Sequence, residues 1–345
     1  MAQRQTTDSP GRTVTSHDVA ALAGVSQPTV SRALRGDARV SEATRQRVRD
    51  AAAKLGYIPS ERGRSLSTRR TRRVGVVVDD LSNPFYLQLL DVLHRELESN
   101  DTKMVMLTSP PDELERAERL VDGSIDGAVL TTTRIGSPAP AELQRRGFPF
   151  VLLNREVDDA QADCCVADNH EGGRLVAAEL ARLGHRDVGA ILGPAHTSTG
   201  RDREAGFRAG LAEHGLQMAD THARRGEFSF DSGYRELTAM ATAGDLPSAV
   251  FCGNDVVALG ALNAASANGL DVPGDLTVIG FDDIEMAGWD LIGLTTVRQD
   301  MERMARTAAT LLVERIADPE RPHERVCVPA ELVARGTHGP PPGHA

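Results

Sequence analysis

The stretch SHDVAALAGVSQPTVSRAL, residues Ser16–Leu34, decides how the N-terminal part of this 345-residue chain folds. Thr15 precedes it and is followed three residues later by an aspartate, which is a capping signal for a helix start. Gly24 ends that helix, because glycine adopts the left-handed conformation at the lowest cost. Ser26 is then a suitable N-cap for a second helix, in which Pro28 is tolerated in the first turn. The stretch therefore predicts two short helices joined by a tight turn.

The spacing within these helices matches a helix-turn-helix. Ala20 permits the two helices to approach closely, Gly24 supplies the turn, and Val30 fills the shared core. A third helix is expected over residues 41–55, which completes a small all-α head. Short helical hairpins also occur in ordinary helix bundles, so the spacing by itself leaves both interpretations open.

The distribution of charge favours the DNA-binding interpretation. Residues 1–73 hold 15 Lys and Arg against 6 Asp and Glu, a net charge of +9, within a chain of net charge −10. Residues 74–345 are therefore strongly acidic, so only the N-terminal part suits a polyanionic partner. A solvated basic tail is the alternative, but a helix-turn-helix with a basic surface predicts nucleic-acid binding.

From Val74 onward, short apolar strands alternate with amphipathic helices. Continuous apolar strands between helices predict parallel sheets covered on both faces, and two sets of strands predict two doubly wound lobes. In such folds ligands bind at the carboxyl ends of the strands. The first set of strands is VGVVV, MVMLT, DGAVLTT and FVLLN, and the second is VGAIL, AVFCG and LTVIGFD.

Several motifs along the chain resemble those of a known protein family. The sequence VTSHDVAALAGVSQPTVSRALRG, followed by VSEATRQRVRDAAAKLGYIP, GRSL and VGVVVDDLSNPFY, resembles the lactose-repressor (LacI/GalR) family of bacterial transcription regulators. Further similar motifs are GHRDVGAILGP, REAGF, GNDVVALGAL, VIGFDD and LTTVRQD, so the resemblance covers Val14 to about Gly336. It implies a helix-turn-helix head and a periplasmic-binding-protein-like α/β core. It also implies a homodimer that binds a pseudo-palindromic operator in double-stranded DNA under control of a small-molecule effector.

The expected organisation follows from these motifs. The core is expected to have an N-lobe over about 74–166 and 299–324, and a C-lobe over about 167–298 and 325–337. The segments in chain order are a disordered N-terminus at 1–13, a DNA-binding domain at 14–58, a hinge helix and linker at 59–73, an effector-binding and dimerisation domain at 74–337, and a tail at 338–345.

The resemblance assigns DNA contacts residue by residue. Gln27, Pro28 and Arg32 fall where the family contacts base edges from the recognition helix, and arginine suits guanine. Thr29 and Ser31 are expected to contact phosphates. Three further residues are also assigned to DNA: Thr15, Ser26 and Arg64. Leu66 is the hinge leucine, which in the family inserts into the minor groove. Gly63 departs from the alanine usual in this motif, which raises the cost of ordering the hinge helix by up to about 1 kcal/mol.

The resemblance also assigns an effector site, whose positions fall on polar or aromatic residues just after strands. The aromatic faces suit the apolar side of a sugar ring, and the polar groups offer the mixed donors and acceptors that hydroxyls need. For any one residue, capping a helix or satisfying a strand end is the alternative. The six positions are Phe85, Asn154, Arg203, Phe228, Asn254 and Asp282.

Other candidate sites are weaker. Adjacent residues such as Asp79 and Asp80 point to opposite faces of a strand, so a turn or cap is expected there, and His185 is expected in a turn. No metal-like spacing, nucleotide-binding loop or nucleophile motif is present, so no metal or cofactor is predicted. The four cysteines, Cys164, Cys165, Cys252 and Cys327, have no disulfide or C-x-x-C pattern and suit a reduced cytoplasm. No apolar run approaches the roughly 20 residues that span a bilayer, and no signal-peptide pattern is seen.

Three functions are therefore compared. A ligand-responsive DNA-binding repressor of sugar uptake or catabolism genes accounts for both parts of the chain. A non-DNA sugar-binding protein would need only the two-lobed core, and an enzyme acting on sugar phosphates would need a catalytic constellation that the sequence lacks. The identity of the effector, the operator sequence and the direction of regulation remain open from sequence.

Overall fold

The computed structural model describes residues 14–58, 70–108, 113–158 and 160–343. The chain divides into two compact units, residues 1–71 and 72–345, and each is described by itself. The expected disordered N-terminus and the hinge assignments of Arg64 and Leu66 lie outside the described residues.

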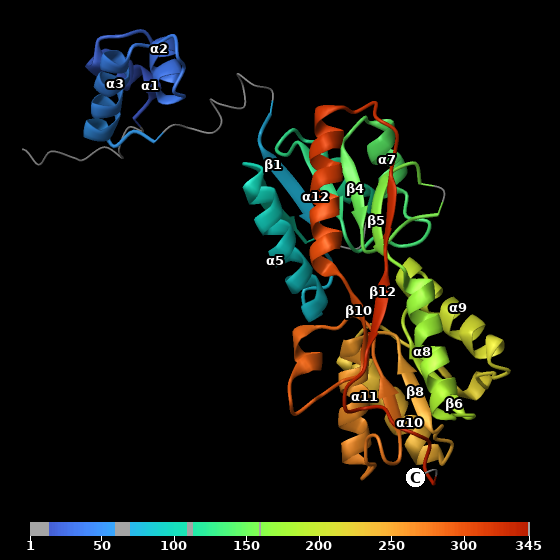
Figure 1. The fold of residues 1–345 in the computed structure, drawn as a ribbon. Helices are drawn as coiled ribbons and strands as arrows, with labels where there is room; N and C mark the ends of the chain where they lie inside the picture. Colours follow the sequence, from blue (N-terminus) through green and yellow to red (C-terminus); the bar gives the residue numbers. More distant parts are fainter. Residues whose placement is uncertain (1–13, 59–69, 109–112, 159, 344–345) are drawn as a thin grey trace, which may run out of the picture. The chain divides into compact units, whose positions relative to one another are not determined.

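The N-terminal unit contains the three helices that the sequence predicts: α1 (Ser16–Ala23), α2 (Gln27–Leu34) and α3 (Glu42–Leu55) (Figure 1). Gly24 and Gly56 end α1 and α3 with positive φ angles of 66° and 61°, a conformation that glycine adopts without a Cβ clash. Val19, Val30 and Val48, one from each helix, are fully buried in the shared core. The exposed residues of the three helices are mostly polar, with Leu22 of α1 as an exposed apolar side chain.

The first lobe of the larger unit is a six-stranded parallel sheet of order β11-β5-β4-β3-β1-β2. α5 and α12 pack together on one face, and α6 and α7 pack together near the other (Figure 1). The elements are β1 (Arg73–Val77), α5 (Pro84–Ser99), β2 (Lys103–Leu107), α6 (Glu113–Leu120), β3 (Gly127–Leu130), α7 (Ala139–Arg145), β4 (Phe150–Leu153), β5 (Asp163–Ala167), α12 (Met301–Ala317) and β11 (Arg325–Val328).

The second lobe is a four-stranded parallel sheet of order β7-β6-β8-β9, with the helix pair α8 and α9 and the helix pair α10 and α11. The elements are α8 (Asn169–Leu183), β6 (Val188–Leu192), α9 (Ser198–Glu213), a 3-10 turn (Asp220–His222), β7 (Ala223–Arg225), α10 (Phe230–Ala243), β8 (Ala249–Cys252), α11 (Asp255–Ala267), β9 (Thr277–Ile279) and a second 3-10 turn (Glu285–Gly288). The prediction of two doubly wound parallel-sheet lobes is confirmed.

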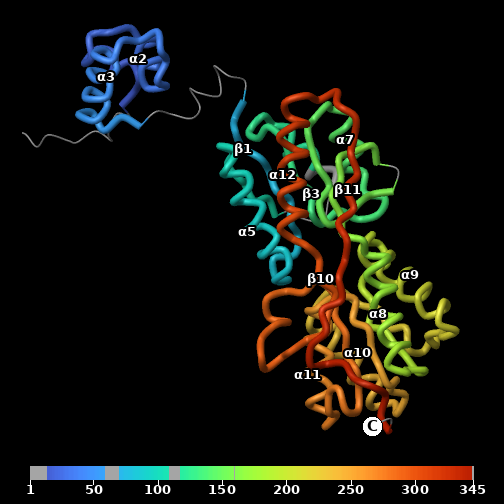
Figure 2. The backbone as a smooth tube through the Cα atoms, in the orientation of Figure 1, coloured from blue at the N-terminus to red at the C-terminus, as the bar shows by residue number. Residues whose placement is uncertain are grey.

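The chain crosses between the lobes three times, and the crossings can be followed in Figure 2. β10 (Thr296–Gln299) and β12 (Ala330–Val333) form an antiparallel pair at two of these crossings. The expected assignment of residues 325–337 to the C-lobe is wrong at its start. Residues Arg325–Val328 form β11, which pairs in parallel with β5 in the first lobe, so the last crossing follows Val328.

The expected tail at residues 338–345 also needs correction, because its first residues are part of the second lobe. The backbone oxygen of Gly339 accepts hydrogen bonds from Thr277 Oγ1 and lies 2.9 Å from His185 Nε2. The Nδ1 atom of His185 lies 2.8 Å from Ser248 Oγ. His185 lies in the turn between α8 and β6, as expected, and there its side chain is 1 % exposed and joins the C-terminal segment to the sheet.

Within each helix pair of the second lobe, the two helices pack against each other at glycine residues. A Cβ atom at Gly206 of α9 would overlap the backbone oxygen of His170 in α8, and one at Gly173 would overlap the backbone oxygen of Arg203. Gly233 of α10 is similarly close to the backbone oxygen of Val257 in α11. Glycine at these positions therefore sets how closely the helices pack, and with it the position of Arg203.

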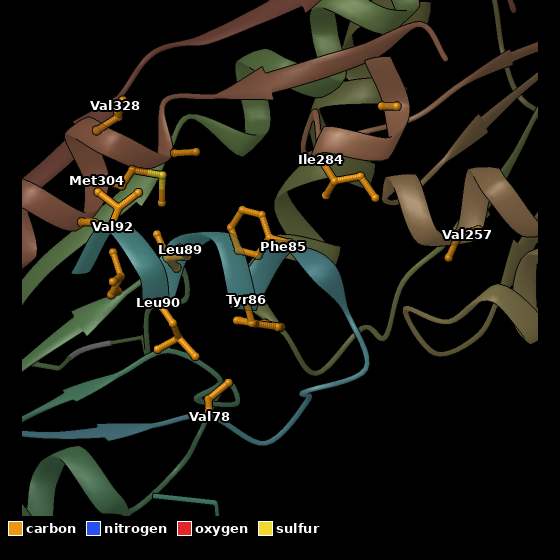
Figure 3. Packing of buried hydrophobic residues seen from close by; sticks show 14 of the residues in the cluster. Val78, Phe85, Tyr86, Leu89, Leu90, Val92, Val257, Ile284, Met304 and Val328 are labelled. Atoms are coloured by element: carbon orange, nitrogen blue, oxygen red, sulfur yellow. The ribbon is translucent and has the colours of Figure 1, made fainter. Parts of the chain in front are cut away.

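One buried hydrophobic cluster contains residues of both lobes. Figure 3 shows part of it, with Phe85 and Leu89 on α5, Met304 on α12, and Val257 and Ile284 from the second lobe. Apolar packing near the junction keeps the strand ends of the two sheets close to each other, which prepares a site between the lobes.

Candidate functional site

The polar residues at the start of the head helices form hydrogen bonds at the N-terminal ends of these helices. The backbone N–H of Thr15 donates to Asp18 Oδ2 at 2.8 Å, and its hydroxyl donates to the same oxygen at 2.7 Å, as the capping signal predicts. The hydroxyls of Ser26 and Thr29 lie 2.8 Å apart at the start of α2. These three assigned DNA contacts therefore also have local structural roles.

The exposed face of α2 carries the residues assigned to base edges. Pro28 and Arg32 are exposed and lie four residues apart, on one side of the helix. Gln27 and Ser31 are partly exposed, and Gln27 Nε2 donates to Ser16 Oγ at 3.2 Å. Within the described part of the chain Arg32 makes no ion pair or side-chain hydrogen bond, whereas Arg39 is bound to Asp37. The guanidinium of Arg32 is thus available to a partner.

In the larger unit, a cavity between the two lobes brings together all six residues assigned to the effector. Four further residues that the sequence interpretation missed complete its wall. The cavity is lined by Asn83, Phe85, Tyr86, Asn154, Arg155, Thr199, Arg203, Phe228, Asn254 and Asp282. The structure thus brings the six assigned residues together at the lobe junction, and that they bind an effector there stays a prediction.

A buried ion pair forms the second-lobe side of this cavity. Arg203 Nη2 lies 3.0 Å from Asp282 Oδ1, and both side chains are almost fully buried. Arg203 also donates to Asn169 Oδ1 at 2.8 Å and to the backbone oxygen of Gly253 at 2.7 Å. Its guanidinium carbon lies 3.8 Å from the centroid of the Phe281 ring. Every side of this guanidinium is held, so its orientation is set before any ligand arrives.

Burial dominates the acid-base behaviour of this pair. It raises the pKa of Asp282 to about 6, although Arg203 and Gln299 act in the opposite direction. Burial also lowers the pKa of Arg203. The neighbouring carboxyl of Asp255 is fully buried, and burial followed by the charge of Asp282 raises its pKa well above the usual range. The Asp282 carboxyl therefore changes its charge around pH 6.

The two asparagines of the cavity differ in how free their side chains are. Asn254 caps α11, because its Oδ1 accepts from the backbone N–H of Val257 at 2.9 Å. For Asn254 Oδ1, the alternative role of capping a helix is therefore the observed one. Asn154 donates to Tyr86 Oη at 3.3 Å, while its buried Oδ1 has no hydrogen-bond partner among the described residues. The backbone of Asn154 has a φ of 72°, a strained conformation of the kind that clusters at functional sites.

The two aromatic residues also have different surroundings. Phe85 is only 2 % exposed and meets the Tyr86 ring edge to face, with centroids 5.4 Å apart. Phe228 is partly exposed and lies against Gly193, where a Cβ atom would overlap its ring. Phe228 therefore offers the more accessible aromatic surface, and Phe85 closes the cavity from the first lobe.

A second, wider cavity of about 310 Å³ adjoins the first and shares Arg155 and Phe228 with it. Asp80 lies in its wall, and its Oδ1 accepts from Ser82 Oγ at 2.7 Å and from the backbone N–H of Asn83 at 3.2 Å. The expected turn or capping role is confirmed for Asp80. The lining is Asp79, Asp80, Ser82, Thr132, Arg134, Arg155, Pro194, His196, Thr197, Glu227, Phe228 and Ser229.

No group of His, Cys, Asp and Glu side chains among the described residues is arranged to hold a metal ion. No described helix combines the length and the apolarity needed to cross a membrane.

A helix-turn-helix with an exposed arginine on its second helix, in one chain with a two-lobed ligand-binding core, defines a ligand-regulated DNA-binding protein. Comparison with protein families agrees with this class. Residues 15–60 match the bacterial regulatory proteins of the lacI family, and residues 177–338 match the periplasmic binding protein-like domain. The chain belongs to the LacI family of bacterial regulators.

Individual relatives match along almost the whole chain. The ribose operon repressor of Escherichia coli K12 is 32 % identical over 94 % of this chain and 99 % of its own length. The HTH-type transcriptional regulator CelR of Thermobifida fusca is 34 % identical over 92 % of this chain and 96 % of its own length. The structure of the Lac repressor dimer bound to operator and the anti-inducer ONPF matches with a TM-score of 0.86 and 27 % identity, covering 94 % of this chain and 99 % of that one.

Proposed function

We propose that this chain is a dimeric transcriptional repressor that binds a pseudo-palindromic operator and responds to a sugar or sugar derivative held between its lobes. It acts in the cytoplasm on the DNA of the nucleoid. The observation that carries the proposal is that six assigned residues, from separate elements of the two lobes, line one interlobe cavity. Relatives named for ribose and a CelR structure in complex with cellobiose support a sugar as the effector class.

The two alternative functions are less well supported. A non-DNA sugar-binding protein would not need the basic head with its exposed Arg32. An enzyme acting on sugar phosphates would need a nucleophile with an adjacent base, whereas the charged pair in the interlobe cavity, Arg203 and Asp282, forms an ion pair. Arg203 is further bound to Asn169 and to the backbone of Gly253. The regulator accounts for both units of the chain.

The proposal is tested by selecting duplexes from a random DNA pool with the full chain and then measuring their release by sugars. A sugar that binds only the folded state raises the melting temperature, so a thermal-shift panel identifies candidate effectors. We expect selected duplexes to contain two related half-sites. Failure to enrich any sequence would reject DNA binding, and release by no sugar or sugar phosphate would reject the effector class.

Arg32→Ala is expected to weaken binding to the selected operator by about 1 to 3 kcal/mol and to relax the preference at one base position. The reason is that its exposed guanidinium can donate two hydrogen bonds to a guanine edge. The measurement is a gel shift with the operator and its single-base variants. Arg47→Ala removes the same charge from α3 and is the control, expected to weaken operator and scrambled DNA alike. Equal behaviour of the two variants would contradict a base contact by Arg32.

Effector affinity is expected to fall as the pH is lowered from 7.5 to 5. The pKa of Asp282 is about 6, so its carboxylate is mostly ionised at the upper pH and mostly protonated at the lower one. Protonation removes both an acceptor for sugar hydroxyls and the counter-charge of Arg203. Calorimetric titration at several pH values measures the effect. Asp282→Asn should flatten the profile and His196→Gln should not; a flat wild-type profile would contradict the role of Asp282.

A further inference from the structure

A further cavity, of about 480 Å³, lies where two of the lobe crossings meet the helices of the first lobe. Its walls come from α5, the first turn of α12, β10, β12 and the residues that join β11 to β12. These elements meet around the start of α12 (Figure 1), and we call the space between them the crossing cavity. It shares no lining residue with the two interlobe cavities. Its volume is within the range of about 300 to 1,000 Å³ that ligand pockets span.

One buried acceptor in the wall of the crossing cavity lacks a partner. Gln299 of β10 is 2 % exposed, and its Nε2 donates to Asp282 Oδ1 at 2.7 Å. Its Oε1 is buried and has no hydrogen-bond partner among the residues that the structure describes. Because Asp282 holds the amide nitrogen, the amide oxygen is left to accept from another group. Buried polar groups are nearly always paired, so this oxygen points to a ligand that carries a donor.

Carboxylates outnumber cations in the lining of the crossing cavity. Its two guanidinium groups, those of Arg298 and Arg303, stand against four carboxylates, those of Asp283, Asp300, Glu302 and Glu331. Arg298 is already matched, because its Nε lies 2.7 Å from Asp283 Oδ2. A positively charged ligand therefore meets net attraction at this cavity, and an anion meets net repulsion.

The first turn of α12 supplies the carboxylate that is most open to a ligand. Glu302 is exposed, and it forms no ion pair within the described part of the chain. The N-terminal end of a helix could instead attract an anion. Here, however, Asp300 Oδ1 accepts from the backbone N–H of Arg303 at 2.9 Å, so a carboxylate of the chain itself already caps this end. Glu302 is left for a cation.

Apolar side chains form another part of the wall. They come from Val92 of α5, Met301 of α12 and the segment Val328–Ala330. Methylene groups gain free energy from burial against such side chains. A buried acceptor, an exposed carboxylate and apolar surface in one cavity match a short hydrocarbon chain with a positively charged donor at each end.

We propose that the crossing cavity is a second ligand site, that its ligand is a short linear diamine, and that the diamine opposes binding of the effector. One ammonium group donates to Gln299 Oε1 and the other to the Glu302 carboxylate. The methylene chain lies against Val92 and Met301. The effect on the effector rests on the proposed function, whereas the diamine site does not.

The opposing effect follows from the arrangement of the lobes in the structure. The interlobe cavity around Arg203 and Asp282 has a volume of about 10 Å³, which has room for about one water molecule and not for a sugar ring. A sugar therefore enters it only after the lobes move relative to each other. The crossing cavity is lined by Asp283 of the second lobe and by α5 and α12 of the first, so a ligand there stabilises the present arrangement. Ligands that favour different arrangements weaken each other's binding.

The site is tested by calorimetric titration of the full chain with three five-carbon compounds: pentane-1,5-diamine, pentane-1,5-diol and glutarate. We expect one diamine to bind per chain with a dissociation constant below about 1 mM, which is a reasonable affinity for so small a ligand. The diol should bind at least about tenfold more weakly, and glutarate should not bind. Absence of diamine binding, or binding of the diol or glutarate as tight as that of the diamine, would overturn the site.

Variants separate this site from the general negative charge of the core. Glu302→Gln should weaken diamine binding at least about tenfold, and Glu302→Asp should keep part of the affinity. Glu320→Gln removes an exposed carboxylate from the turn after α12 and is the control, expected to stay within about twofold of the wild type. Equal losses in Glu302→Gln and Glu320→Gln would show that the diamine is held only by overall charge, and the site would be rejected.

The opposing effect is measured with the sugar that gives the largest thermal shift. Saturating diamine should weaken the affinity for this sugar at least about fivefold, and saturating sugar should weaken the affinity for diamine by the same factor. Unchanged or tighter sugar binding would overturn the opposing effect. Failure of every sugar to bind would overturn the proposed effector class and the opposing effect with it, whereas the diamine titrations decide the second site by themselves.

Discussion

Arg203→Met is expected to abolish effector binding and to lower the free energy of unfolding by about 3 to 5 kcal/mol. The arginine is 3 % exposed, and it donates to Asn169 and the backbone of Gly253 in addition to pairing with Asp282. Its removal leaves the Asp282 carboxylate buried without its cation and leaves two acceptors unpaired. Chemical denaturation measures the loss of stability, and the thermal-shift panel measures the loss of effector binding.

A second substitution separates stability from function at this pair. Because burial raises the pKa of Asp282 and lowers that of Arg203, desolvation outweighs the mutual attraction of the two groups. Removing both charges is therefore expected to be far less destabilising than removing one, as in buried pairs generally. Arg203→Met combined with Asp282→Leu should recover most of the stability and none of the effector binding. Recovery of binding would show that the pair serves only the fold.

Arg208→Met is the matched control on the same helix. Arg208 is partly exposed and pairs with Glu204 at 2.9 Å, four residues earlier. Exposed pairs of this kind contribute about 0.3 to 0.5 kcal/mol, so this variant should remain stable and bind effector normally. If Arg208→Met lost as much stability and effector binding as Arg203→Met, burial of the ion pair would not explain the effect.

The sequence predicted the six assigned cavity residues and missed others for a definable reason. The family resemblance assigned Asn154 and did not extend to Arg155 directly behind it. Thr132 was missed because it follows β3 within a run of three threonines that has no distinctive charge or aromatic character. Tyr86 was missed because the resemblance assigned its neighbour Phe85 in the same motif.

The missed strands have a different cause. β5 contains Asp163, which a rule based on apolar runs rejects, yet this carboxylate is fully buried and lies 2.8 Å from Arg315 Nε in α12. β7 has the sequence Ala-Arg-Arg and lies at a sheet edge, where polar side chains reach solvent. β11 is an edge strand with an exposed Cys327. These strands are stabilised by pairing with segments distant in the sequence, which local sequence patterns do not reveal.

Gly206→Ala is expected to destabilise the second lobe by about 3 kcal/mol and to weaken effector binding. A Cβ atom here would overlap the backbone oxygen of His170 in α8, and a backbone atom cannot rotate away as a side chain can. The two helices must separate, at an overpacking cost of about 1 to 3 kcal/mol or occasionally more. Alanine gains about 1 kcal/mol over glycine in helix propensity, so a net loss means that the overlap dominates.

The effect on binding follows from what α8 and α9 carry. Arg203 on α9 donates to Asn169 on α8, so separation of the helices moves the guanidinium away from the position that the cavity requires. Ala205→Ser is the control, because it adds one atom at the neighbouring exposed position and should change stability by less than about 0.5 kcal/mol. Denaturation and sugar titration of both variants give the comparison. If Gly206→Ala is as stable as the wild type and binds effector equally well, close packing of this helix pair does not position Arg203.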